Sequence, residues 1–218
     1  MSNLKITKKN KGTGAGGKNT TLNGGSFEKV TSIESKLLEE GFSKKEFNKS
    51  KQYYYEKVLG DYTLIYVSQR GLRTFMEQFY NTSAIRNPDE AFIIINNKYK
   101  TKKPVLNILE KKYQSRDGSV DIKLWAGPSI KREYEIYYGD KFDISYAFSL
   151  SEYLEKKMNS NCKKWIILNK IFIEYDIKSF YDSDTKYLDR VYNWAFDTKS
   201  TEKVKPPIKK DKLKDIEV

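Results

Sequence analysis

The sequence predicts an α/β domain in which helices flank a central, mixed β-sheet. Short runs of β-branched and aromatic residues, such as residues 92–95 (FIII), are typical of strands. Segments with apolar residues at helical spacing lie between these runs. Hydrophobic residues make up 38% of the 218 residues and aromatic residues 14%, which is enough for one core.

In the first half of the chain, apolar residues recur at helical spacing from Phe27 to Leu38, directly after Ser26, a favourable N-cap residue. Gly41 is expected to end this helix, because glycine readily adopts the left-handed conformation that follows a helix end. The further elements expected in this half are a strand at 61–68, a helix at 72–80, and strands at 92–95 and 105–109.

In the second half, Gly118 and Ser119 begin a short helical pattern that runs to about Trp125. Two aromatic and β-branched stretches, near 134–149 and 165–175, predict strands. Helices are expected between and after these stretches, at 151–158 and 184–196.

The two ends of the chain differ in composition from the middle. Residues 1–25 are mostly Lys, Gly, Asn and Thr, so we expect a flexible basic arm there. Residues 199–218 are Lys-rich and include Pro206 and Pro207, so we expect a basic tail. A single folded domain is therefore expected over 26–198.

Residues 12–18 (GTGAGGK) fit the first part of a P-loop. A P-loop needs Ser or Thr next, where this chain has Asn19, and an apolar strand before it, where this chain is polar. No nucleotide cofactor is therefore expected.

The chain is strongly basic, with 41 Lys and Arg against 29 Asp and Glu and a net charge of +12. Such a charge is typical of proteins that bind a polyanion, DNA or RNA first, although an excess spread over a solvated surface is the alternative. The chain has no His and a single Cys, Cys162, which excludes Ser-His-Asp triads, His-ligated zinc and internal disulfides. A catalytic metal would need oxygen ligands, which favours Mg²⁺, Mn²⁺ or Ca²⁺.

No segment resembles a signal peptide, and no apolar run approaches the roughly 20 residues that span a bilayer. We therefore expect a cytoplasmic protein without a membrane partner.

Two acidic residues flank consecutive predicted strands. Asp89 precedes one strand and Glu110 follows the next, with 20 residues (90–109) between them. If these strands are neighbours, both carboxylates can hold one metal ion. Because alternate side chains of a strand face the same side, Glu110, Lys112 and Gln114 are expected to point together. Carboxylates that hold Mg²⁺, with an ammonium that orients water, suit phosphodiester hydrolysis.

The pattern Pro88-Asp89…Glu110-x-Lys112 resembles the signature of PD-(D/E)XK nucleases. The wider runs 110–120 and 23–28 resemble a group of type II restriction endonucleases, and the resemblance covers about residues 12–125. It implies a restriction-endonuclease-like core, Mg²⁺ as cofactor, and a homodimer that acts on short palindromic DNA. It also implies that Asp89 and Glu110 are metal ligands and that Lys112 acts on the attacking water, with Gln114 in support.

Glu28 matches an acidic residue of the first core helix that often completes the site in that superfamily. An ordinary first-turn acid, favoured by the helix dipole, is the alternative interpretation of Glu28.

The resemblance thus implies a Mg²⁺-dependent, sequence-specific endonuclease of double-stranded DNA. The sequence leaves two alternatives open, which are a DNA repair or junction nuclease of the same fold and a nucleic-acid-binding protein without catalysis.

Other acidic residues compete for the same roles, because 32% of the residues are charged. Asp176 and Lys178 form another acid-x-Lys triplet at the end of a predicted strand, with Asp143 as its upstream acid, but no proline precedes Asp143. Glu90 is an alternative to Asp89 as the first metal ligand, although the preceding proline favours Asp89.

Basic residues of two segments are candidates for DNA contacts. The first segment is the loop between the two site strands, which we expect to lie close to the site, and the second follows the short helix near residue 125. The candidates are Lys98, Lys100, Lys102, Lys103, Lys131 and Arg132.

Overall fold

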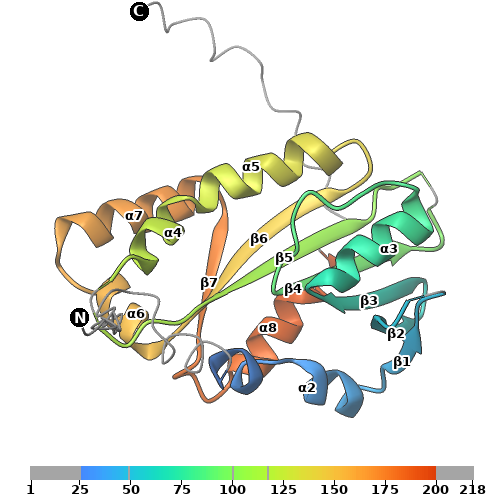
Figure 1. The fold of residues 1–218 in the computed structure, drawn as a ribbon, viewed down its shortest axis with the longest axis horizontal. Coiled ribbons are helices and arrows are strands. Elements are labelled where there is room, and N and C mark those ends of the chain that lie inside the picture. The colour runs from blue at the N-terminus through green and yellow to red at the C-terminus, as the bar shows by residue number, and fades with distance from the viewer. Residues whose placement is uncertain (1–25, 49, 100, 117, 200–218) are drawn as a thin grey trace, which may run out of the picture.

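The computed structural model describes residues 26–48, 50–99, 101–116 and 118–199. Their fold is α/β, with one seven-stranded mixed sheet flanked by helices, which confirms the predicted fold class and is consistent with a restriction-endonuclease-like core (Figure 1). The arm expected at 1–25, the tail expected at 199–218 apart from Lys199, and Lys100 lie outside the described residues.

The strands lie side by side in chain order. Pairing is antiparallel from the first strand to the fifth, and parallel from the fifth to the seventh. The strands are β1 (Ser43–Glu46), β2 (Tyr53–Leu59), β3 (Tyr62–Ser68), β4 (Glu90–Asn96), β5 (Val105–Lys112), β6 (Asp143–Leu150) and β7 (Ile177–Tyr181).

Helices make the crossovers that parallel strands require. Two helices connect β5 to β6 and two connect β6 to β7. The helices are a short one at 26–30, α2 (Glu34–Glu39), α3 (Arg70–Tyr80), α4 (Val120–Trp125), α5 (Gly127–Tyr138), α6 (Glu152–Met158), α7 (Lys163–Glu174) and α8 (Tyr187–Ala195).

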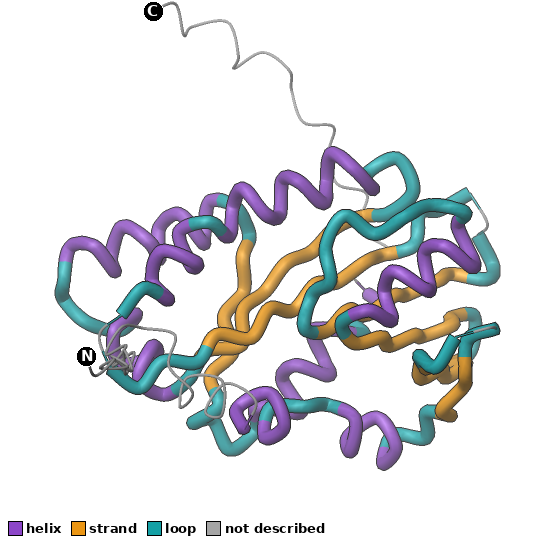
Figure 2. Tube along the Cα trace, viewed as in Figure 1, coloured by secondary structure: helices purple, strands orange, loops and turns teal. Residues whose placement is uncertain are grey.

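The sheet has a hydrophobic core on each face, so the molecule has three layers (Figure 2). One core contains side chains from α3 and from α4 to α7, and the other contains side chains from α2 and α8. Strand β5 contributes to both, because Leu106 and Ile108 face the first core whereas Val105 and Leu109 face the second.

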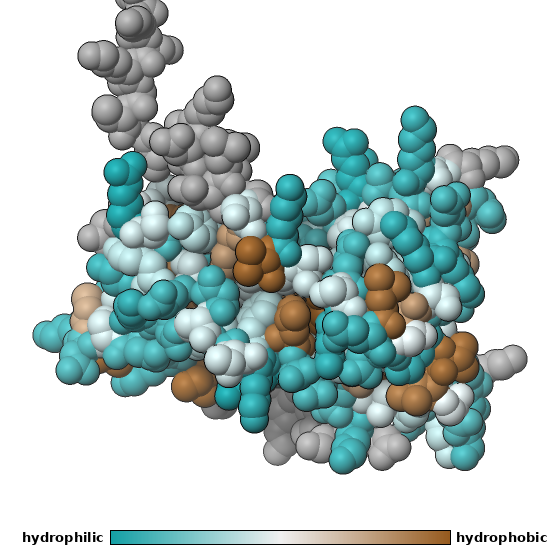
Figure 3. All heavy atoms as spheres, turned by 90° about the horizontal axis from the view of Figure 1, so that it is seen from below, coloured by the Kyte–Doolittle hydropathy of each residue, from teal (hydrophilic) through white to brown (hydrophobic). Residues whose placement is uncertain are grey.

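On the face of the molecule seen from below, hydrophobic residues form separate patches among hydrophilic ones (Figure 3). Scattered apolar groups of this kind are normal on a protein surface. None of the helices in the described part of the chain is long and apolar enough to cross a membrane.

The helix expected from Ser26 to Gly41 is interrupted. Thr31 bonds back to the Phe27 carbonyl oxygen through its hydroxyl at 2.6 Å, and helical structure resumes only at Glu34. Val30, the last residue before the break, is 73% exposed. The helical region ends at Gly41 as predicted, because Gly41 follows α2 and has a φ of +83°.

The strand predicted at 165–175 is wrong, because these residues belong to helix α7. Trp165, Leu168 and Phe172 are buried at helical spacing, but exposed isoleucines between them, such as Ile167 and Ile173, produce a β-like composition. The strand predicted at 134–149 is correct only for its second part, since the first part ends helix α5 and strand β6 begins at Asp143.

Replacing Gly41 by Ala is expected to lower the free energy of unfolding by about 1 kcal/mol. No atom lies within 4 Å of the position that a Cβ would occupy, so the cost comes from the left-handed backbone and not from a clash. Urea unfolding measures the effect. Gly41→Asn is the matched control and should cost less, because Asn adopts this conformation more readily. Equal stability of Gly41→Ala and wild type would contradict the interpretation.

Candidate active site

Asp89 and Glu110 meet at one end of the central sheet. Strands β4 and β5 are antiparallel neighbours, and Glu90 is paired with Leu109. Asp89, one residue earlier, therefore lies opposite Glu110, one residue later. The expectation that the two strands are neighbours is confirmed.

The Lys112 ammonium lies between these two carboxylates. Its Nζ is 2.7 Å from Glu110 Oε2 and 3.7 Å from Asp89 Oδ2, and it donates a hydrogen bond to the Lys111 carbonyl oxygen at 3.1 Å. The three side chains are only 16–23% exposed. A cation is thus already held between two acids in a partly desolvated site, where charges interact more strongly than in water.

The electrostatics of Glu110 reflect this setting. Burial raises the pKa of the Glu110 carboxyl above its ordinary value, the Lys112 ammonium opposes this shift, and the Asp89 carboxylate adds to it. Glu110 therefore gains from any further positive charge placed beside it.

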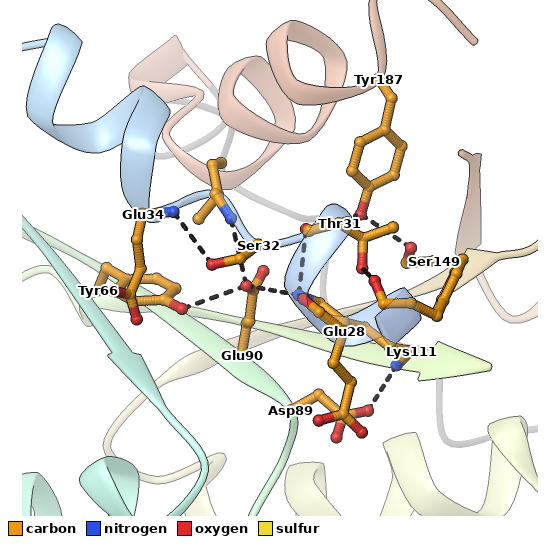
Figure 4. Close-up of polar contacts among 12 residues, drawn as sticks. Glu28, Thr31, Ser32, Glu34, Tyr66, Asp89, Glu90, Lys111, Ser149 and Tyr187 are labelled. Atoms are coloured by element: carbon orange, nitrogen blue, oxygen red, sulfur yellow. Dashed lines mark hydrogen bonds and ion pairs between the residues drawn. The ribbon is translucent and has the colours of Figure 1, made fainter. Parts of the chain in front are cut away.

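Glu90, the alternative first ligand, points to the opposite face of the sheet (Figure 4). Its Oε1 is 2.8 Å from Lys111 Nζ and accepts hydrogen bonds from the Tyr66 hydroxyl at 3.2 Å and the Ile33 amide at 3.5 Å. Burial raises its pKa, and Lys111 opposes the shift. The geometry therefore groups Asp89, and not Glu90, with Glu110 and Lys112.

Gln114 does not continue the alternation along β5, because the strand ends at Lys112. The Gln114 backbone exchanges hydrogen bonds with the Ser151 hydroxyl at 3.2 and 2.8 Å, and its side-chain amide donates to the Arg116 carbonyl oxygen at 2.6 Å. The expectation that Gln114 points with Glu110 and Lys112 as part of one strand face is therefore wrong.

Glu28 lies on the exposed side of the 26–30 helix. Figure 4 shows its side chain extending from the helix toward Asp89. The helix itself is attached near the site, because the Glu28 carbonyl oxygen accepts a hydrogen bond from Lys111 Nζ at 3.3 Å.

Three residues that the sequence did not indicate surround Glu110. Arg86 binds Glu133 of α5 through Nε at 2.7 Å and Nη2 at 2.6 Å, and its charge lowers the pKa of Glu110. Tyr134 and Tyr146 are buried, their hydroxyls have no hydrogen-bond partner within the described part of the chain, and burial together with the Glu110 charge raises their pKa. No spacing pattern could have indicated this group, because the fold assembles it from a loop, a helix and a distant strand.

The loop with Lys98, Lys102 and Lys103 is not close to the candidate site, contrary to expectation. It joins the far ends of β4 and β5, and the seven residue-to-residue steps from Asp89 to Asn96 span about 23 Å at the usual rise of a strand. Lys98 is 3.9 Å from Asp61, and Lys103 donates to the Gly139 carbonyl oxygen at 2.6 Å.

Lys131 and Arg132 also differ from one another. Lys131 is only 7% exposed, and its Nζ donates to the Tyr175 carbonyl oxygen at 2.6 Å, so its surroundings do not suit a DNA contact. The Arg132 side chain is 65% exposed, and its Nη1 donates to Glu135 Oε2 at 3.2 Å, so its role as a DNA contact stays a prediction.

The competing acid-x-Lys triplet at 176–178 does not end a strand, because the strand predicted before it is helix α7. Asp176 lies between α7 and β7 and Lys178 is the second residue of β7, and their exposed side chains form an ion pair of 2.9 Å. Asp143, its proposed partner, is exposed at the first residue of β6.

The oxygen atoms beside Lys112 suit a hard divalent cation. Asp89 and Glu110 supply carboxylates, and the Lys111 carbonyl oxygen lies beside them. Over the described ranges, no group of three or more His, Cys, Asp or Glu side chains is spaced to hold a metal ion. A metal here would rely on two carboxylates, the carbonyl oxygen and water.

No protein-family model matches the chain, and neither curated proteins nor solved structures provide a match. A functional assignment must therefore come from the site itself.

Breaking the buried Glu90–Lys111 pair is expected to destabilise the fold strongly. Glu90→Ala leaves the Lys111 ammonium buried without its counter-charge, which costs about 3–5 kcal/mol in the free energy of unfolding. Lys178→Ala is the matched control, because it breaks an exposed pair of similar length and should cost less than about 1 kcal/mol. Urea unfolding compares the two variants, and similar costs would refute the assignment of a structural role to the buried pair.

Proposed function

We propose that this chain is a Mg²⁺-dependent, sequence-specific endonuclease of double-stranded DNA, a type II restriction enzyme with a PD-(D/E)XK site. The observation that carries the proposal is the position of the Lys112 ammonium between Asp89 and Glu110, at adjacent ends of two antiparallel strands. That arrangement unites the two residue types that phosphodiester hydrolysis requires.

The residues present fit Mg²⁺, because the donors beside Lys112 are all oxygen atoms and Mg²⁺ prefers oxygen ligands. Asp89 and Glu110 would hold the ion. When bound, the ion lowers the pKa of a coordinated water and neutralises negative charge on the phosphate.

Lys112 has two tasks in the proposed reaction. With its contacts to Asp89 and Glu110, its ammonium is fixed at the site, where it orients the attacking water by donating a hydrogen bond to the water oxygen. The same charge stabilises the additional negative charge that the phosphate gains as water adds and a P–O ester bond breaks.

The charge of the whole chain supports a polyanionic substrate. The net charge is +12, and DNA carries one negative charge per phosphate. A homodimer is part of the proposal, because cutting both strands of a palindrome requires two sites related by a two-fold axis. A cytoplasmic location completes it, since a restriction enzyme must meet DNA inside the cell.

Purified protein incubated with unmethylated phage or plasmid DNA and Mg²⁺ is expected to give discrete fragments, and EDTA is expected to abolish them. Lys112→Ala, Asp89→Asn and Glu110→Gln should each lower the cleavage rate by at least about 100-fold, because each removes a charge from the site. Gel electrophoresis of timed digests measures the rate.

Asp176→Asn and Lys178→Ala are the matched controls, since they alter another acid-x-Lys triplet, whose charged side chains are exposed at the start of β7. Both should cleave like wild type. A Mg²⁺-dependent smear that Lys112→Ala abolishes would favour a repair or junction nuclease of the same fold. Intact DNA with every metal and DNA source tried would favour a binding protein and reject catalysis.

The affinity of the site for divalent metal should rise with pH. A carboxylate must lose its proton to bind a metal, and the pKa of Glu110 is raised by burial, so binding is weakened below that raised pKa and recovers as pH passes through it. While Glu110 is protonated, affinity should change about tenfold per pH unit. Titration of Mn²⁺ by electron paramagnetic resonance at a series of pH values from about 4 upward measures this dependence, and an affinity that does not change with pH would contradict it.

A further inference from the structure

Lys111 has a complete set of hydrogen-bond partners on the face of the sheet opposite to the candidate site. Its Nζ is 2.8 Å from Glu90 Oε1, 3.1 Å from the Thr31 carbonyl oxygen and 3.3 Å from the Glu28 carbonyl oxygen. An ammonium has three donor hydrogens, so these acceptors match its capacity. The side chains of Lys111 and Glu90 are only 3% and 2% exposed.

Two of these acceptors belong to the end of the 26–30 helix, where carbonyl groups lack partners within the helix and a cation is favourable. Lys111 thus connects β5 to this helix, and Glu90 supplies the counter-charge from β4. Packing of Phe27 against Tyr113, with ring centroids 5.5 Å apart, adds a second contact between the helix and the segment after β5.

A buried ion pair is a weak source of stability, because apolar side chains of similar size often stabilise a fold equally well. What the pair provides here is a defined position for the helix end. The consequence reaches the candidate site, because the Lys111 amide donates to Asp89 Oδ2 at 2.6 Å and Glu28 extends from the same helix toward Asp89 (Figure 4).

We propose that Glu90 and Lys111 are positioning residues of the candidate nuclease site, whose buried ion pair fixes the end of the 26–30 helix and thereby holds the Glu28 carboxylate toward Asp89. This inference rests on the proposed function, because it concerns residues that position the same site. Neither residue touches the reacting atoms, since both side chains face the other core.

The test replaces both charges at once. Glu90→Leu with Lys111→Met leaves no buried charge unpaired, so the urea midpoint should stay near that of wild type. The kcat for DNA cleavage should nevertheless fall about 10- to 100-fold, as is usual when groups that orient a site are lost, while DNA binding measured with Ca²⁺ stays unchanged. Amide hydrogen exchange at residues 27–31 should become faster. A purely structural role predicts wild-type kcat at wild-type stability, so that result would overturn the proposal.

A mutant cycle with Glu28→Gln tests the route of the effect. If the pair acts by holding Glu28, then Glu28→Gln alone should lower kcat with wild-type hydrogen exchange. Adding it to the double replacement should produce no further loss, because both changes remove the same interaction. Losses that multiply would show that the pair does not act through Glu28 and would overturn the assignment.

Tyr66→Phe is the matched control, because it removes a hydrogen bond of 3.2 Å from the same Glu90 oxygen and leaves the link to the helix intact. It should match wild type in kcat and in exchange of residues 27–31. If wild-type protein does not cleave DNA at all, the proposed function fails, and hydrogen exchange then decides the positioning claim alone. Faster exchange in the double replacement supports that claim, and unchanged exchange overturns it.

Discussion

The register between β4 and β5 is the constraint on which the rest of the candidate site depends. Because Glu90 is paired with Leu109, Asp89 is brought opposite Glu110, and the alternation of side chains then sends Lys112 to the same face and Lys111 to the other. A slip of one residue would exchange these faces and place Lys111 beside the acids. The long apolar runs of both strands oppose such a slip, since Leu106 and Ile108 fill one core while Leu109 fills the other.

The same register places two charged groups side by side on both faces, with different solvent exposure. On one face, Lys112 and Glu110 keep 16% of their surface exposed, so a substrate can reach them. On the other, Lys111 and Glu90 are almost completely enclosed by the core that includes α2 and α8. Enclosure raises the free-energy cost of leaving either charge of the buried pair without its partner, whereas water or a ligand can replace a contact of the partly exposed pair.

Much of the central architecture could be predicted from sequence, for identifiable reasons. Uninterrupted apolar runs such as 92–95 identify buried strands, and Gly41 identifies a helix end because its conformation excludes most residues. Prediction failed for α7, where exposed isoleucines such as Ile173 imitate a strand, and for the helix after Ser26, which is broken at residues 31–33. The failure at α7 arises because the burial of a side chain depends on neighbours far along the chain, which a local pattern does not contain.

The sequence also predicted the candidate site only in part. Spacing and alternation predicted the meeting of Asp89 with Glu110, since both lie at the ends of adjacent strands. They misplaced Gln114, because nothing local indicates that β5 ends at Lys112. Nor could they place Arg86, which reaches the site through a loop and is held there by Glu133 of a helix that follows in the chain.

The charges at the site suggest why a metal and a nucleic acid would bind together. Asp89, Glu110 and Lys112 carry a formal charge of −1 in total, so the site repels a phosphodiester although the whole chain carries +12. A divalent cation reverses the sign to +1 and makes the same position attractive to a phosphate. In the proposed nuclease, the basic charge of the chain would therefore bring DNA to the protein without metal, whereas close approach of a phosphate to Glu110 would depend on the metal. Because burial disfavours the ionised form of Glu110, the added positive charge also offsets the free-energy cost of keeping that carboxylate charged.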